Sequence, residues 1–126
     1  MALRVGIDLV DVAEIEAAIA DHGERYLDRL FTAREQRDCA GDPARLAARF
    51  AVKEAAIKVL RPGPEQPVPW LEIEVARNSD GAIDVVLTGS AEQLAARAGL
   101  TGFAASLTHQ GANASAVVIA ELVEGS

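Results

Sequence analysis

Apolar and polar side chains alternate near the start of the chain, and the spacing then becomes helical. Residues 3–10 alternate loosely around apolar positions and predict a first β-strand, in which Asp8 is the only acidic residue. Apolar residues recur at helical spacing from Asp11 to about Ala20, so a helix is expected there. A second short helical segment, 25–31, follows it.

Two start signals predict the next helices. Thr32 and Glu35 have the spacing of a capping box, in which a hydroxyl and a carboxylate bind free amides at a helix start, so a helix is expected near 33–40. Asp42-Pro43 combines a favoured N-cap with proline at the first helical position. It opens the longest predicted helix, 43–61, which a Pro-Gly pair ends.

The second half of the chain begins with a proline-rich loop, 62–69. Its prolines fix the direction in which the chain leaves the long helix. Two alternating segments, 70–78 and 82–89, then surround a Ser-Asp-Gly turn. This pattern predicts a β-hairpin.

A short helix and two further strands complete the pattern. Ser90 and Gln93 repeat the capping-box spacing ahead of an alanine-rich helix that ends at Gly99. The segments 102–109 and 114–122 predict strands around a short turn. Because helices precede neighbouring strands without regular alternation, an α+β fold with an antiparallel sheet is favoured over a doubly wound fold.

Length, charge and cysteine content narrow the class of protein. The 126 residues, half of them hydrophobic, suit a single domain over 1–126, whose small core suggests oligomerisation. Neither a secretory signal nor a run of about 18 apolar residues is evident, so a cytoplasmic protein without membrane contact is expected. The net charge of -7 argues against a nucleic-acid partner. Cys39 is the only cysteine, and with the two histidines of the chain it makes a poor set of zinc ligands, so a buried or idle thiol is expected.

The longest predicted helix carries charges on a face that should be apolar. Projection at about 100° per residue puts Lys53 within an apolar stripe, with Glu54 and Lys58 at its margin. Such charges cannot all be buried without partners. Glu54 and Lys58 are four residues apart in the favourable order for an ion pair, so a solvated helical salt bridge is one interpretation. The stripe consists of Leu46, Phe50, Ile57 and Leu60.

Asp8 supports a second interpretation of these charges. It lies alone in an apolar strand, and two carboxylates from separate elements can hold one hard cation. Magnesium takes one or two carboxylates and fills its other positions with waters and phosphate oxygens. Asp8 and Glu54 are therefore candidate ligands of Mg²⁺.

Three motifs, in this order and at this separation, resemble those of holo-[acyl-carrier-protein] synthases, the small group of phosphopantetheinyl transferases. They are GIDLV around Asp8, RFAVKEAAIK over 49–58, and SLTH ending at His109. RLFTAREQ and AVVIAE extend the resemblance over nearly the whole chain. Each motif is weak alone, and the set is specific.

The resemblance implies a phosphopantetheinyl transferase fold, in which an antiparallel sheet packs against a long central helix and shorter helices. It implies transfer of phosphopantetheine from coenzyme A to a serine of an apo acyl carrier protein, or of a carrier domain in a larger fatty-acid or polyketide synthase. Adenosine 3′,5′-bisphosphate would be released. The resemblance also implies a homotrimer with active sites between subunits.

The same resemblance implies roles for individual side chains. Asp8 and Glu54 would bind Mg²⁺ together with the diphosphate of coenzyme A, and Lys58 would contact the same phosphates. Arg49 and His109 would lie near the 3′-phosphate. The serine proton would pass to Glu54 or to a water on the metal, and both acceptors stay open.

Two features depart from the family pattern. After the long helix the family often has a Gly-Thr-Gly turn, whereas this chain has Arg61-Pro62-Gly63. Gly63 remains a candidate for cofactor binding, although Pro62 removes a backbone donor. The first predicted helix is acidic where relatives present basic residues to the carrier, which predicts a less acidic carrier. Its acidic residues are Asp11, Glu14, Glu16, Asp21 and Glu24.

Two alternatives to the enzyme stay open. One is a catalytically weak, transferase-like subunit that binds carrier protein or nucleotide as an assembly partner. The other is an unrelated α+β domain with chance motif matches. Asp8, Glu54 and Lys58 favour the enzyme, because a structural role has no need of a pair of hard-metal ligands.

Overall fold

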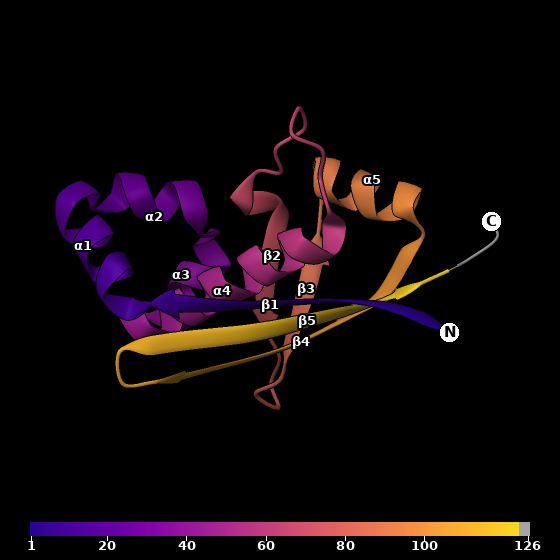
Figure 1. Cartoon of the computed structure of the whole chain (residues 1–126). Coiled ribbons are helices and arrows are strands. Elements are labelled where there is room, and N and C mark those ends of the chain that lie inside the picture. The colour runs from indigo at the N-terminus through magenta and orange to yellow at the C-terminus, as the bar shows by residue number, and fades with distance from the viewer. Residues whose placement is uncertain (124–126) are drawn as a thin grey trace.

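The computed structural model describes residues 1–123 and packs a layer of helices on one face of an antiparallel sheet (Figure 1). This sheet has three strands in the order β1-β5-β4. They are β1 (Ala2–Asp11), β4 (Leu100–Gln110) and β5 (Asn113–Leu122). A separate two-stranded sheet pairs β2 (Ile73–Arg77) with β3 (Ile83–Leu87). The predicted α+β class and antiparallel pairing are confirmed, with the strands divided between two sheets.

The helices follow the predicted order along the chain. The bounds are α1 (Val12–His22), α2 (Glu24–Leu30), α3 (Ala33–Cys39), α4 (Pro43–Leu60) and α5 (Gly89–Ala98), with a 3-10 turn, η1 (Trp70–Glu72). The longest helix, α4, is the central one, and its alanines let it lie close against the sheet. Five of them are fully buried, namely Ala47, Ala48, Ala51, Ala55 and Ala56.

The start signals of α3 and α4 are confirmed. Thr32 Oγ1 accepts a hydrogen bond from the Glu35 amide, and the Glu35 side chain accepts one from the Thr32 amide, which completes the capping box. Asp42 Oδ1 accepts from the Ala44 amide at the start of α4. These local bonds fix where both helices begin.

Two predictions around η1 are wrong. The strand expected from residue 70 begins only at Ile73, because Trp70–Glu72 form the 3-10 turn. The Ser90–Gln93 capping box is not formed, since α5 begins at Gly89. Its first turn is bound instead by Glu72, whose Oε1 accepts from the Ala91 amide at 2.9 Å and from the Ser90 hydroxyl.

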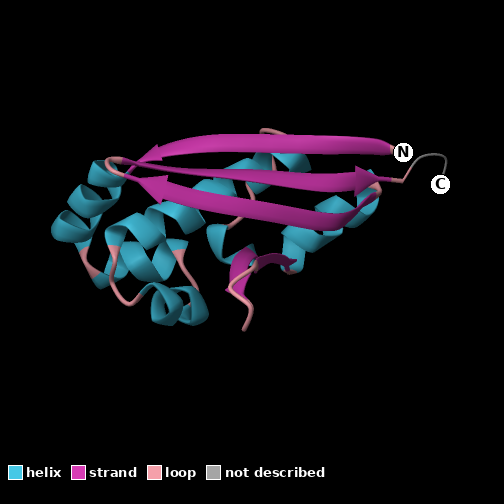
Figure 2. Cartoon of the chain, turned by 90° about the horizontal axis from the view of Figure 1, so that it is seen from below, coloured by secondary structure: helices cyan, strands magenta, loops and turns pink. Residues whose placement is uncertain are grey.

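The three-stranded sheet has one covered and one uncovered face. Figure 2 shows the helices on one side of the three strands. Among residues 1–123, the alternate β1 side chains Leu3, Val5, Ile7 and Leu9 remain between 59% and 68% exposed. Ile119 on β5 adds to this uncovered apolar face, which we call the outer face. Within residues 1–123, no helix has the length and apolar character needed to cross a bilayer.

Candidate active site

Asp8 and Lys58 meet where β1 crosses α4. Alternation along β1 turns Asp8 toward the helix layer, on the same side as Gly6 and away from the outer face. Lys58 Nζ lies 3.1 Å from Asp8 Oδ1 and donates to the Ile7 carbonyl oxygen at 2.7 Å. No ion pair joins Lys58 to Glu54 within residues 1–123, so the helical salt-bridge interpretation is wrong. The cation crosses to the strand because two oxygen acceptors are available there.

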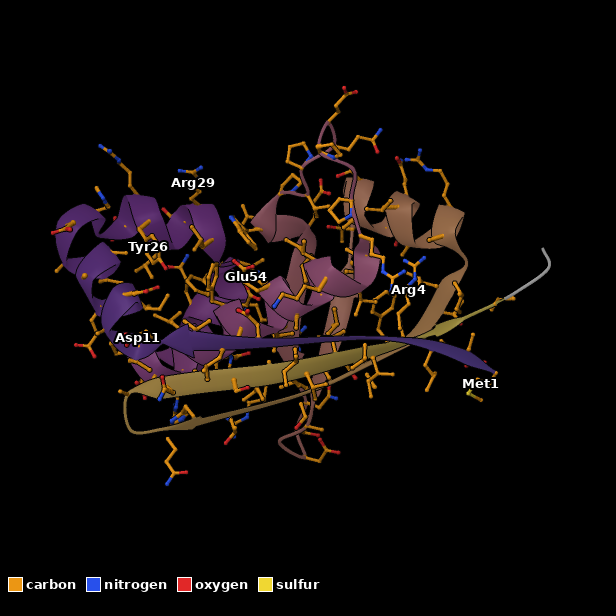
Figure 3. The ribbon with its side chains drawn as sticks, in the orientation of Figure 1. Met1, Arg4, Asp11, Tyr26, Arg29 and Glu54 are labelled. Carbon is orange, nitrogen blue, oxygen red and sulfur yellow. The ribbon has the colours of Figure 1, made fainter. Side chains whose placement is uncertain are left out.

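Glu54 lies one helical turn before Lys58 and shares its surroundings with Asp8. Figure 3 shows Glu54 in the helix layer above β1, between the labels of Asp11 and Arg4. Burial raises the pKa of Glu54 above its ordinary value, and the negative charge of Asp8 raises it further. Lys58 lowers the same pKa, but its effect is the smallest of the three. The two carboxylates therefore lie close enough to repel each other.

The cluster of Asp8, Glu54 and Lys58 has the donor chemistry of a small oxygen site for a divalent cation. The negative charge of Asp8 acts on Glu54, and the Lys58 ammonium lies 3.1 Å from Asp8, so two carboxylates share a site with one ammonium group and a further positive charge is favoured there. No group of three or more potential metal-ligating side chains occurs in the part of the chain that the structure describes. A cation held by these two carboxylates would keep positions for other oxygen ligands, as Mg²⁺ prefers.

The other predicted site residues lie apart from this cluster within one chain. Arg49 is only 5% exposed, and its Nη1 donates to the Arg45 carbonyl oxygen at 3.5 Å. His109 is exposed near the end of β4, two strands away from β1. Gly63 is exposed in the loop after α4. The residue that caps the end of this helix, Arg61, is left-handed, with φ 52°. A single chain thus brings together the residues expected to bind the metal and the diphosphate. It does not bring Arg49 and His109, which are expected at the 3′-phosphate, to the same place.

Comparisons with known proteins agree with the motifs at this cluster. A family model, the 4'-phosphopantetheinyl transferase superfamily, matches residues 4–116. A holo-[acyl-carrier-protein] synthase of Desulforudis audaxviator is 43% identical over 123 residues, which cover 95% of this chain and 93% of that relative. The chain belongs to the holo-[acyl-carrier-protein] synthase family.

Solved structures of this synthase family share the fold. The Helicobacter pylori holo-[acyl-carrier-protein] synthase in complex with coenzyme A has a TM-score of 0.83 and 27% identity, covering 94% of this chain and 100% of that one. The Mycobacterium tuberculosis acyl carrier protein synthase has a TM-score of 0.76 and 35% identity, covering 94% and 96%. The predicted phosphopantetheinyl transferase fold is confirmed.

In this member of the synthase family, Lys53 pairs with Glu35 and not with the carboxylates of the candidate site. Its side chain is fully buried, and its Nζ lies 2.9 Å from Glu35 Oε1, itself fully buried. Burial lowers the pKa of Lys53, and the charge and hydrogen bond of Glu35 oppose that shift. The partner was missed in the sequence, because Glu35 was assigned only to its capping box and no spacing rule connects residues 35 and 53.

Cys39, the one cysteine of the chain, is unpaired. It is fully buried at the end of α3, and burial is the largest cause that raises the pKa of its thiol to about 11. A thiol with this pKa is almost wholly protonated at neutral pH and is a poor nucleophile and metal ligand. The predicted buried thiol is confirmed.

Proposed function

We propose that this chain transfers the 4′-phosphopantetheine group from coenzyme A to a serine of an apo acyl carrier protein. The serine oxygen forms a bond to the β-phosphorus of coenzyme A, and the bond from that phosphorus to the bridging oxygen breaks, which releases adenosine 3′,5′-bisphosphate. The observation that carries the proposal is the meeting of Asp8 with Glu54 and Lys58. The names of the relatives, and the coenzyme A in the Helicobacter pylori complex, support the substrates.

Asp8 and Glu54 would hold Mg²⁺, whose oxygen preference fits their donor set. The ion would supply positive charge to the phosphoryl oxygens of the diphosphate. Lys58 adds a second positive charge on the same side of α4, where its Nζ is already held by Asp8. The serine proton would pass to Glu54 or to a water on the ion.

A direct transfer assay tests the function. The chain is incubated with coenzyme A, Mg²⁺ and several apo-carriers, and the carriers are weighed by mass spectrometry. A mass gain of one phosphopantetheine is expected, and it should be lost when the carrier serine is replaced by alanine. Carrier binding without any mass gain on any carrier would favour the alternative, a transferase-like assembly partner.

We also propose that the active molecule is a homotrimer in which copies of the chain meet on the outer face. Five apolar side chains remain exposed there among the described residues, and large exposed apolar patches mark contact surfaces. Arg49 and His109 would then contribute to 3′-phosphate sites completed by a neighbouring subunit. A cytoplasmic location and service to fatty-acid or polyketide synthesis stay predictions from the family resemblance, as does coenzyme binding by Gly63.

Replacing Val5 with glutamate is expected to break this assembly. The substitution places a charge in the middle of the outer face, where a subunit contact would have to bury it without a partner. Light scattering should show the mass falling from three chains to one, with transfer activity lost alongside. Ala96→Glu is the matched control, because Ala96 is exposed on α5 and gains the same charge away from the sheet. An unchanged mass for Val5→Glu would contradict the proposed interface.

The carrier is proposed to be less acidic than usual for this family, because α1 presents acidic side chains to solvent. Those on and beside the helix are all exposed, namely Asp11, Glu14, Glu16, Asp21 and Glu24. Like charges across an interface slow association and weaken binding. A carrier domain with fewer acidic residues, such as one in a larger synthase, fits this surface better.

Glu14→Arg tests the carrier preference. It should raise kcat/KM for an acidic carrier by about 3- to 10-fold at low salt, and the gain should shrink as salt screens the charges. Glu65→Arg, an equal charge change in the exposed proline-rich loop, is the control. Equal turnover of acidic and neutralised carriers, together with no response to Glu14→Arg, would contradict the proposal.

A further inference from the structure

Lys53 uses its whole hydrogen-bonding capacity inside the protein, one residue before Glu54. Its Nζ contacts Glu35 Oε1 at 2.9 Å, donates to the Trp70 carbonyl oxygen at 3.0 Å, and also donates to the Ile73 carbonyl oxygen. An ammonium group has three donors, so all of them are used. The ring of the buried Phe31 lies 5.9 Å from the same nitrogen. Lys53 therefore links α4 to η1 and to the start of β2.

Glu35 is bound just as fully on its side of the pair. Its Oε1 accepts from the Thr32 amide at 2.8 Å, and its Oε2 accepts from the Val75 amide at 2.8 Å. The two side chains together connect α3, α4, η1 and β2. Buried ion pairs often stabilise no better than apolar side chains of similar volume, because both charges lose their hydration. What this pair adds is directed bonds to particular backbone groups.

Lys53 holds the backbone of residues 70–73, which we call the wall. The wall packs on the side of α4 that carries Phe50 and Glu54. The Trp70 indole packs on Phe50, with ring centroids 5.1 Å apart, and Phe50 lies four residues before Glu54 on the helix. Residues four apart on a helix are neighbours on one face. Trp70 and Leu71 line a cleft of about 430 Å³ with Arg29 of α2 and with the end of the proline-rich loop, 67–69.

We propose that Lys53 and Glu35 are positioning residues for the transfer reaction, because they fix the wall beside Glu54 and this wall orients coenzyme A. The inference rests on the proposed function and extends it to residues that do not touch the substrate. The wall follows a loop of several prolines, and its apolar contact with Phe50 is non-directional, so that contact alone does not fix the position of the wall along α4. The two carbonyl acceptors, Trp70 and Ile73, give that position a direction and a distance.

The double variant Glu35→Leu/Lys53→Met tests the pair. It replaces both charges with apolar side chains of similar size, so the fold should persist while the directed bonds to the wall are lost. Trp70 is the only tryptophan in the chain, so its fluorescence reports on the wall alone. Its emission should shift to longer wavelength and become more accessible to acrylamide. The KM for coenzyme A should rise about 10-fold, with kcat less affected.

The change in KM separates positioning from simple loss of folded protein, which would lower kcat at an unchanged KM. Arg45→Met is the matched control, since Arg45 lies on the same helix and its ion pair, with the N-cap Asp42, is half exposed and involves no residue of the wall. It should leave the Trp70 fluorescence and the KM unchanged. A folded double variant with the KM of the parent protein would overturn the proposal, whether or not its fluorescence changes.

A second variant keeps the test decisive if the double variant does not fold. Trp70→Ala retains the backbone carbonyl that Lys53 binds and removes only the half-buried indole. It should also raise the KM for coenzyme A, and an unchanged KM would overturn the proposal. Absence of transfer by the parent protein would instead refute the proposed function, and acrylamide quenching would still report whether the pair holds the wall.

Discussion

Replacing Glu54 with glutamine is expected to give a protein that is folded, at least as stable as the parent, and inactive. Burial and the nearby Asp8 charge raise the pKa of Glu54, so its charged form is disfavoured in the folded state. A neutral amide of the same shape removes that penalty, and the Tm should stay equal or rise. The variant also loses half of the proposed cation ligands, so transfer should fall by at least about 100-fold. Calorimetry, metal titration and the mass assay measure these three effects.

Two further substitutions give this experiment its controls. Asp8→Asn should lose transfer and divalent-ion binding in the same way, because it removes the other carboxylate of the cluster. Glu65→Gln removes an equal charge from an exposed loop position and should change neither property. Full activity in Glu54→Gln or in Asp8→Asn would refute the assignment of that residue as a ligand.

Anomalies in the sequence pointed to three residues that the structure brings together, Asp8, Glu54 and Lys58. Asp8 was the lone acidic residue of an apolar strand, and helical projection put Glu54 and Lys58 on neighbouring positions of α4. The end signals located that helix to within one residue, 43–61 expected and Pro43–Leu60 observed. Lys53, a charge in an apolar stripe, indicated a buried partner, and the structure contains one. The helix bounds and the shared face of Glu54 and Lys58 were predictable because each depends on the period or the end signals of a single element.

The rest depended on contacts between elements that no spacing rule describes. Glu35 lies 18 residues before Lys53, and only the packing of α3 against α4 brings them together. A pair between Lys58 and Glu54 was one interpretation of the sequence, but Lys58 instead reaches a strand 50 residues away in the chain. Ser90 has a capping-box partner in sequence, yet Glu72 binds the start of α5 from another element. Side chains with several possible partners cannot be assigned until the packing is known.

Gly6→Ala is expected to separate β1 from α4 and so to damage both stability and the candidate site. A Cβ built at Gly6 lies 2.1 Å from the Ala55 carbonyl oxygen and 3.2 Å from Lys58 Cβ. Real Cβ atoms do not approach a backbone oxygen so closely, and the helix backbone cannot turn aside as a flexible side chain would. Overpacking of this kind costs about 3 kcal/mol, which lowers the Tm of a domain of this size by roughly 10 °C.

The same displacement should move the carboxylate of Asp8 away from Glu54, since Asp8 follows Gly6 by two residues on the same side of β1. Divalent-ion affinity, measured by titration of the folded variant well below its Tm, should therefore fall together with transfer. Gly63→Ala is the stability control, because a Cβ at Gly63 has no neighbour within 4 Å and should leave the Tm unchanged. If Gly6→Ala lowers the Tm but keeps the parent's ion affinity, Gly6 only allows close packing. Weaker ion binding in the folded variant would show that the close crossing of β1 over α4 also holds the two carboxylates at their working separation.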